Sequence, residues 1–216
     1  MAETTTAPVA HQFDDAHQQR EAAILGMWVF LITEVMMFGA LFAGYAVHRH
    51  AYPESFAIGS RHLNLLLGSI NTVVLLTSSL LMSLGMRAVR LDQRKALLGC
   101  LTATMLLGVV FLGIKGLEYS HKIHEHLVPG AQFVFEGAMH RQMYVFFSFY
   151  FVMTGLHALH LIIGIGMLGT LVVLARQGRF SSRYYAPVEL GGLYWHFVDI
   201  VWIFLFPLLY LIGRHS

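Results

Sequence analysis

The chain has 216 residues, of which 56% are apolar and only 12% are charged, and its mean hydropathy is +0.62. This composition excludes an ordinary soluble domain and favours a single membrane domain. The formal net charge of +2 gives no sign of a nucleic-acid partner. Cys100 is the only cysteine, which excludes an intrachain disulfide and a cysteine-only metal site. The 13 histidines leave metal or haem ligation open.

The apolar pattern predicts an all-α fold with five transmembrane helices. Residues 1–21 are polar and are expected to form a mobile cytoplasmic tail, with a short surface helix near its end. Residues 22–216 form the membrane domain, because roughly 20 apolar residues cross a bilayer as a helix. The predicted spans are about 22–47, 64–86, 96–117, 142–175 and 188–213.

Lysine and arginine are distributed unevenly among the loops between these spans. The basic residues concentrate in the two tight turns near 87–95 and 176–183, which lie on the same side as the N-terminus. Because basic loops stay in the cytoplasm, we expect a cytoplasmic N-terminus and a periplasmic C-terminus.

Two acidic side chains fall near the middle of predicted spans, Glu34 in the first and Asp199 in the last. At about 1.5 Å per residue, Asp199 lies roughly 15 Å beyond Glu189. An ionisable group at that depth is expensive unless it faces another helix or a water pocket. Two interpretations of Glu34 are open. In the functional one, it is a buried acid that holds a proton, orients a lipid head group or bonds to another helix. In the structural one, it is a protonated carboxyl that is hydrogen-bonded inside the bundle. With no basic residue within a turn on its own helix, we expect Glu34 to be neutral at pH 7.

Histidines form the next group of candidates. His157 and His160 share one helix face, and His196 shares a face with Asp199 on the last span. Three histidines near one level are either haem or metal ligands or hydrogen-bond partners of Glu34, Asp199 and helix hydroxyls. The histidines near 121–126 lie in a loop, where a solvated surface is expected.

Lys115 and Glu118 stand three residues apart at the end of the third span. A lysine and a glutamate at this spacing on a helix form an ion pair. At a membrane boundary, the ordinary interpretation is a pair whose charged ends reach the aqueous interface.

Several motifs occur in a specific order along the chain. The first is Gly26–Glu34, followed by His48. Next come Asn71–Ser79 and Glu118-Tyr119. The last two are Thr154-Gly155-Leu156-His157-Ala158-Leu159-His160 and Tyr194–Trp202. Together they resemble subunit III of haem-copper terminal oxidases, the cytochrome c oxidase subunit III family, in its short five-helix bacterial form. The last two motifs match the TGxHxxH and YWHFVDxVW signatures; the signature residues of the latter are Tyr194, Trp195, Phe197 and Trp202. The resemblance extends from about residue 22 to the C-terminus. Thr33, Ala158 and Lys115 depart from the common pattern, and Lys115 leaves open whether the third helix has its usual partners.

The resemblance implies a subunit of the bacterial cytoplasmic (inner) membrane that carries no catalytic residue, metal, haem or copper of its own. The helices are expected in two groups, spans 1–2 against spans 3–5, around a V-shaped cleft that holds phospholipid. The haems and copper belong to partner subunits. The chain is expected to pack on subunit I, with subunit II and a small subunit IV as further components. There it would support proton uptake, oxygen access and sustained turnover of a proton-pumping cytochrome c or quinol oxidase in aerobic respiration. The buried or cleft-lining polar residues are then Glu34, His48, Arg61, Asn71, His157, His160, His196 and Asp199, with Lys115 and Glu118 as a helix-end pair.

Two other hypotheses remain at this point. A relative of the same family associates with nitric oxide reductase and differs in the partner that copurifies. A small transporter using Glu34 and Asp199 as proton carriers belongs to another class. Such transporters usually contain inverted repeats or broken helices, and the sequence shows neither.

Overall fold

The computed structural model describes residues 11–130, 133, 135 and 139–211. These residues form six α-helices and no β-strand; the last helix continues into a short π-helical segment. Five of the helices are long and apolar enough to cross a membrane, which confirms the predicted fold class. The elements are α1 (Ala16–Ala51), α2 (Pro53–Arg61), α3 (Leu65–Arg90), α4 (Arg94–His124), α5 (His140–Arg176), α6 (Ala186–Phe206) and η1 (Pro207–Leu211).

The ends of the helices follow local signals. The carboxylate of Asp15 accepts a hydrogen bond from the Gln18 amide at 2.7 Å, so α1 begins at Ala16, inside the stretch assigned to the tail. The part of the tail before residue 11 lies outside the described residues. The polar connection between the first two spans contains a helix of its own, α2, with Pro53 in its first turn. Asn64 then caps α3 by accepting from two backbone amides.

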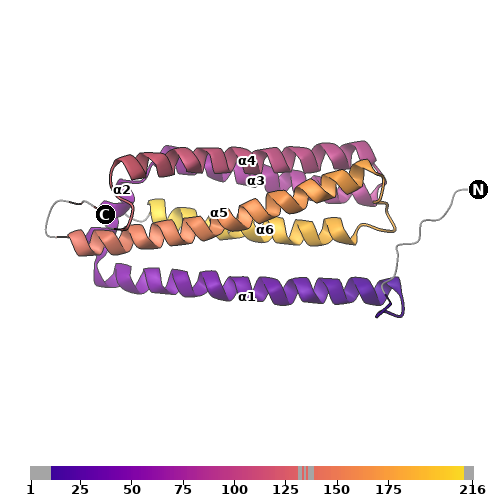
Figure 1. The fold of residues 1–216 in the computed structure, drawn as a ribbon, viewed down its shortest axis with the longest axis horizontal. Helices are drawn as coiled ribbons and strands as arrows, with labels where there is room; N and C mark the ends of the chain where they lie inside the picture. The colour runs from indigo at the N-terminus through magenta and orange to yellow at the C-terminus, as the bar shows by residue number, and fades with distance from the viewer. Residues whose placement is uncertain (1–10, 131–132, 134, 136–138, 212–216) are drawn as a thin grey trace, which may run out of the picture.

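The helices group differently from the expected arrangement. Figure 1 shows α3 and α4 side by side, α5 and α6 next to them, and α1 at the opposite edge of the bundle. α3 packs mainly on α4 and also on α6, whereas α1 packs on α5 and α6. The expected grouping of spans 1–2 against spans 3–5 is therefore wrong. The physical reason is the connection: a turn of only three residues, 91–93, makes α3 and α4 antiparallel neighbours, while α2 separates α1 from α3.

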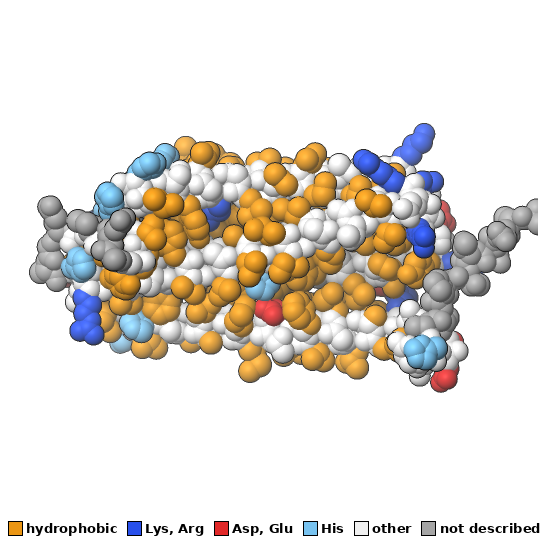
Figure 2. Space-filling view, viewed as in Figure 1, with side chains coloured by type: hydrophobic (Ala, Val, Ile, Leu, Met, Phe, Trp, Pro, Cys, Tyr) orange, Lys and Arg blue, Asp and Glu red, His pale blue; other side chains and the backbone are white. Residues whose placement is uncertain are grey.

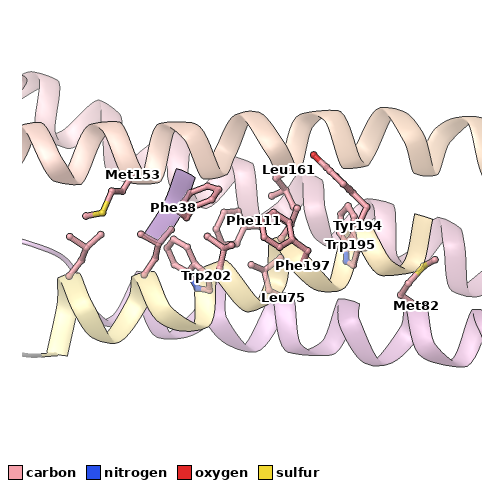
Figure 3. Close-up of a cluster of buried hydrophobic side chains, with 14 of the residues drawn as sticks. Phe38, Leu75, Met82, Phe111, Met153, Leu161, Tyr194, Trp195, Phe197 and Trp202 are labelled. Carbon is pink, nitrogen blue, oxygen red and sulfur yellow. The ribbon is translucent and has the colours of Figure 1, made fainter. Parts of the chain in front are cut away.

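Aromatic side chains of α6 fill the centre of the bundle (Figure 3). Trp195 and Trp202 are completely buried, and the Trp202 ring meets the Phe111 ring edge-on with 4.8 Å between their centroids. Trp195 fits because Gly108 stands opposite it; a Cβ on Gly108 would lie 2.8 Å from the indole. Each Phe, Tyr or Trp side chain buries about 150–250 Å² of surface, so the aromatic residues contribute most of the hydrophobic area in such a core.

On the face shown in Figure 2, most side chains along the middle of the bundle are hydrophobic, apart from an adjacent acid and histidine, while Lys, Arg and most His side chains gather at the two ends. At the end where α1 begins, the two tight turns contact each other. Asp92 accepts a hydrogen bond from the Ser182 amide at 2.6 Å, and Arg94 donates to the carbonyl of Ala175 at 3.0 Å. The hydrogen bonds from Ser182, together with the charge of Arg183, lower the pKa of Asp92. The basic turns and the start of α1 therefore lie at one end of the bundle.

Candidate functional site

The candidate site begins with Glu34, which meets a histidine from another helix. His160 on α5 places Nε2 3.0 Å from Oε2 of Glu34 on α1. The side chains are 10% and 17% exposed, so the contact lies between the helices but near the outer surface. Phe38 and Phe197 flank the His160 ring. The sequence left this hydrogen bond as one of two alternatives for His160, and it is the one observed.

The other nitrogen of His160 fixes the chemistry of this pair. Nδ1 lies 2.7 Å from the carbonyl oxygen of Leu156, and because a carbonyl only accepts, Nδ1 carries a hydrogen. A contact of 3.0 Å then requires a second proton between Glu34 and Nε2. That proton resides either on the carboxyl or on the imidazole, and in both cases the pair is neutral overall. A neutral pair is the arrangement that costs least in a membrane.

A second polar cluster surrounds Lys115 on α4. Its ammonium lies 2.9 Å from Glu118 Oε2 and 2.7 Å from the Tyr210 hydroxyl, with the Tyr150 hydroxyl at 3.4 Å. Tyr210 donates to the other oxygen of Glu118 at 2.6 Å. Aromatic rings enclose the ammonium, which stands 5.1 Å from the centroid of Trp202.

The ion pair of Lys115 and Glu118 is confirmed, but its predicted position is wrong. Their side chains are only 6% and 2% exposed, so the pair is buried in the bundle and does not reach an aqueous interface. The reason is that both face inward on α4, toward α5 and the end of α6, where tyrosine hydroxyls replace water. The hydrogen-bond partners of Lys115 are Glu118, Tyr150 and Tyr210.

A row of hydrogen bonds joins α3 to α6. The indole of Trp195 donates to Ser78 at 3.1 Å, and the indole of Trp202 donates to Thr72 at 3.1 Å. Next to the Trp195 contact in both helices, His196 Nδ1 lies 2.8 Å from the hydroxyl of Ser79. The hydroxyl-rich second span thus supplies partners for three members of the Tyr194–Trp202 motif.

Three buried polar side chains have no hydrogen-bond partner among the described residues. They are Asn71, His157 and Asp199, with 0%, 1% and 3% of the residue exposed. The His157 ring lies against Trp202, with 5.3 Å between centroids, and edge-on to Phe111 at 5.5 Å. The sequence predicted that these residues are buried, but not that they lack partners.

The histidines do not form one ligand set. His160 faces Glu34, His157 is enclosed by aromatic rings, and His196 faces the serines of α3. Within the part of the chain that the structure describes, no group of three His, Cys, Asp or Glu side chains is arranged to hold a metal ion.

His48 and Arg61 are the remaining two residues of the predicted polar set. His48 hydrogen-bonds the carbonyl of Gly44 on its own helix at 2.9 Å and packs against Phe149. Arg61 lines a cavity of about 270 Å³ at the end of the bundle where α4 ends. Glu118, His121 and Lys122 line the same cavity, so the Lys115 cluster adjoins it.

One cluster was missed by the sequence analysis. Arg20 on α1 binds Glu189 on α6 at 2.6 Å, and Arg90 on α3 approaches the other oxygen of Glu189 at 3.7 Å. Both guanidinium groups also lie over the ring of Tyr185. In the sequence, the only indication of this cluster is Glu189, an acidic residue at the start of the last span. Its partner Arg20 falls within the stretch assigned to the tail, so no contact between them is predicted. This cluster connects three transmembrane helices at one end of the bundle.

Comparison with known proteins gives a consistent result over almost the entire chain. Residues 9–214 match the family model described as cytochrome c oxidase subunit III. Cytochrome c oxidase subunit 3 of Thermostichus vulcanus is 34% identical over 93% of this chain and 92% of its own length. The probable quinol oxidase subunit 3 of Staphylococcus haemolyticus is 32% identical over 88% of both chains. Subunit 3 of the cytochrome bo(3) ubiquinol oxidase of Pseudomonas aeruginosa is 30% identical over 95% of this chain and 92% of its own. With five membrane-spanning helices and the Tyr194–Trp202 motif in its core, this chain belongs to the cytochrome c oxidase subunit III family.

Proposed function

We propose that this chain is the non-redox subunit III of a bacterial haem-copper terminal oxidase in the cytoplasmic membrane. It packs on subunit I, with subunit II and a small subunit IV in the same complex, and the haems and copper are held by its partners. Its roles are to bind phospholipid, to support proton uptake and oxygen access, and to sustain turnover. The observation that carries this proposal is the pair Glu34–His160, a neutral polar contact between α1 and α5 in a protein of this family.

The position of this pair suggests how it supports the complex. α1 lies at the edge of the bundle and is covered least by the other helices, so Glu34 is one of its few polar contacts with them. The pair is also slightly exposed at the outer surface, where a lipid head group or the partner subunit can approach it. We infer that it holds α1 in place while subunit I turns over, without taking part in electron transfer.

The experiment is to purify the complex through a tag on this chain, from cells that express the wild type, Glu34→Ala or Glu34→Gln. We expect a larger haem- and copper-containing subunit to copurify with each. In Glu34→Ala, the initial oxygen-reduction rate and the haem spectrum should stay near wild type, while activity should decline sooner over many turnovers or lipid content should fall. Glu34→Gln keeps a hydrogen-bond donor toward His160 and should behave more like the wild type.

Two results would contradict the proposal. Recovery of the tagged chain without any haem-containing partner would exclude a place in a terminal oxidase. An immediate loss of oxygen reduction in Glu34→Ala, with the complex intact, would assign Glu34 to the chemistry and not to support.

A further inference from the structure

The strongest unexplained feature of the interior is the carboxyl group of Asp199 on α6. Both of its oxygens are buried and neither has a hydrogen-bond partner among the described residues. Only 3% of the residue is exposed. A buried carboxyl without any partner costs several kcal/mol whichever form it takes, and such groups in native proteins usually indicate bound water or an ion.

Asp199 has a polar neighbour on an adjacent helix. Ser79 on α3 is its polar neighbour, but the Ser79 hydroxyl already lies 2.8 Å from Nδ1 of His196. The hydroxyl either donates to Nδ1 or accepts from it, depending on the tautomer of His196. No described group, Ser79 included, stands in hydrogen-bond geometry to either oxygen of Asp199, so the carboxyl is left without a donor.

Polar side chains next to Asp199 reach the outer surface of the bundle. Ser79 and His196 are half-buried, and Ser83, one turn farther along α3, is exposed and lies 3.4 Å from Nε2 of His196. The polar groups therefore extend from the outer surface at Ser83 inward to Asp199. A water molecule needs two to four polar partners, and Asp199, Ser79 and His196 provide them.

We propose that the interface between α3 and α6 contains a water-binding site formed by Asp199, Ser79 and His196, which reaches the surface of the bundle at Ser83. One or more water molecules donate hydrogen bonds to the carboxyl. The site accounts for an aspartate inside a membrane-spanning helix that no described protein group satisfies. It is independent of the role proposed for Glu34, which lies between other helices.

The test is electron cryo-microscopy of the intact complex at a resolution that shows ordered water. We expect a density peak about 2.5–3.0 Å from a carboxyl oxygen of Asp199, the distance of an O–H···O hydrogen bond from water. The peak should disappear in Asp199→Leu. It should persist in Thr77→Val, because Thr77 is exposed on α3 and bonds only its own helix.

Three outcomes would overturn the proposal. The first is a map in which the carboxyl hydrogen-bonds directly to a side chain of this chain or of a neighbouring subunit, with no water peak. Alternatively, the peak has the short distances and high ligand number of a metal ion. The third outcome is a peak that remains unchanged in Asp199→Leu. Should that variant fail to assemble, the wild-type map alone decides between water and a direct contact.

Discussion

Removal of one member of the Lys115–Glu118 pair should destabilise the protein strongly, and we develop this prediction first. The pair is almost fully buried, and Glu118 also accepts from Tyr210 at 2.6 Å. Lys115→Met leaves a buried carboxylate without its cation, and Glu118→Gln leaves a buried ammonium without its anion. Breaking a buried pair in this way typically costs about 3–5 kcal/mol.

The chain contains a matched control for this substitution. Lys122 and Glu125 are also three residues apart on the same segment, with 2.5 Å between their charged atoms, but the Glu125 side chain is 50% exposed. The Lys122 side chain is only 7% exposed, so this pair is half-buried, and water can compensate at Glu125 but hardly at Lys122. Glu125→Gln should therefore cost less than the roughly 3–5 kcal/mol of a fully buried pair and more than the roughly 0–1 kcal/mol of an exposed one.

The assay is denaturant-induced unfolding of the detergent-solubilised complex. Unfolding is monitored through the release of this subunit from the complex. We expect Glu118→Gln and Lys115→Met to lower its stability more than Glu125→Gln, because both members of the Lys115–Glu118 pair are buried. The double variant Lys115→Met with Glu118→Gln leaves no uncompensated charge, so it should be more stable than either single variant. The reasoning is refuted if Glu118→Gln costs no more than the control, or if the effects of the two substitutions simply add.

Further predictions concern packing, orientation and cofactors. Gly108→Ala should cost about 1–3 kcal/mol because the added Cβ would lie 2.8 Å from Trp195, whereas Gly113→Ala meets nothing within 4 Å and should be neutral or slightly stabilising in the same unfolding assay. A reporter fused after Ser216 should be active in the periplasm and one inserted at 91–93 in the cytoplasm; the reverse pair would show that loop charge does not set the orientation. The isolated chain in detergent should contain no stoichiometric iron or copper, and a Soret band would contradict its non-redox assignment.

The sequence by itself determined the number of membrane spans and the family. Hydropathy needs no knowledge of neighbours, because each span must satisfy its own backbone as a helix whatever it packs against. The Tyr194–Trp202 motif was also recognised from the sequence. The 3.6-residue helical repeat predicted that His196 and Asp199 share one face of the helix that contains it. Spacing also identified Lys115 and Glu118 as partners, since residues three apart on one helix are neighbours.

Only the tertiary structure decided which groups meet across helices. Helical periodicity shows that Glu34 faces inward, but nothing in it selects His160 on α5 over His157 one turn earlier. The same limit explains why the pairing of α1 with α5 and α6, and the link from Arg20 to Glu189, were not foreseen. A contact between helices depends on their relative rotation, shift along the axis and order of packing. Those are set by the fit of all side chains at once. Asp199 was therefore recognisable from sequence as a buried acid, but not as one without a hydrogen-bond partner among the described residues.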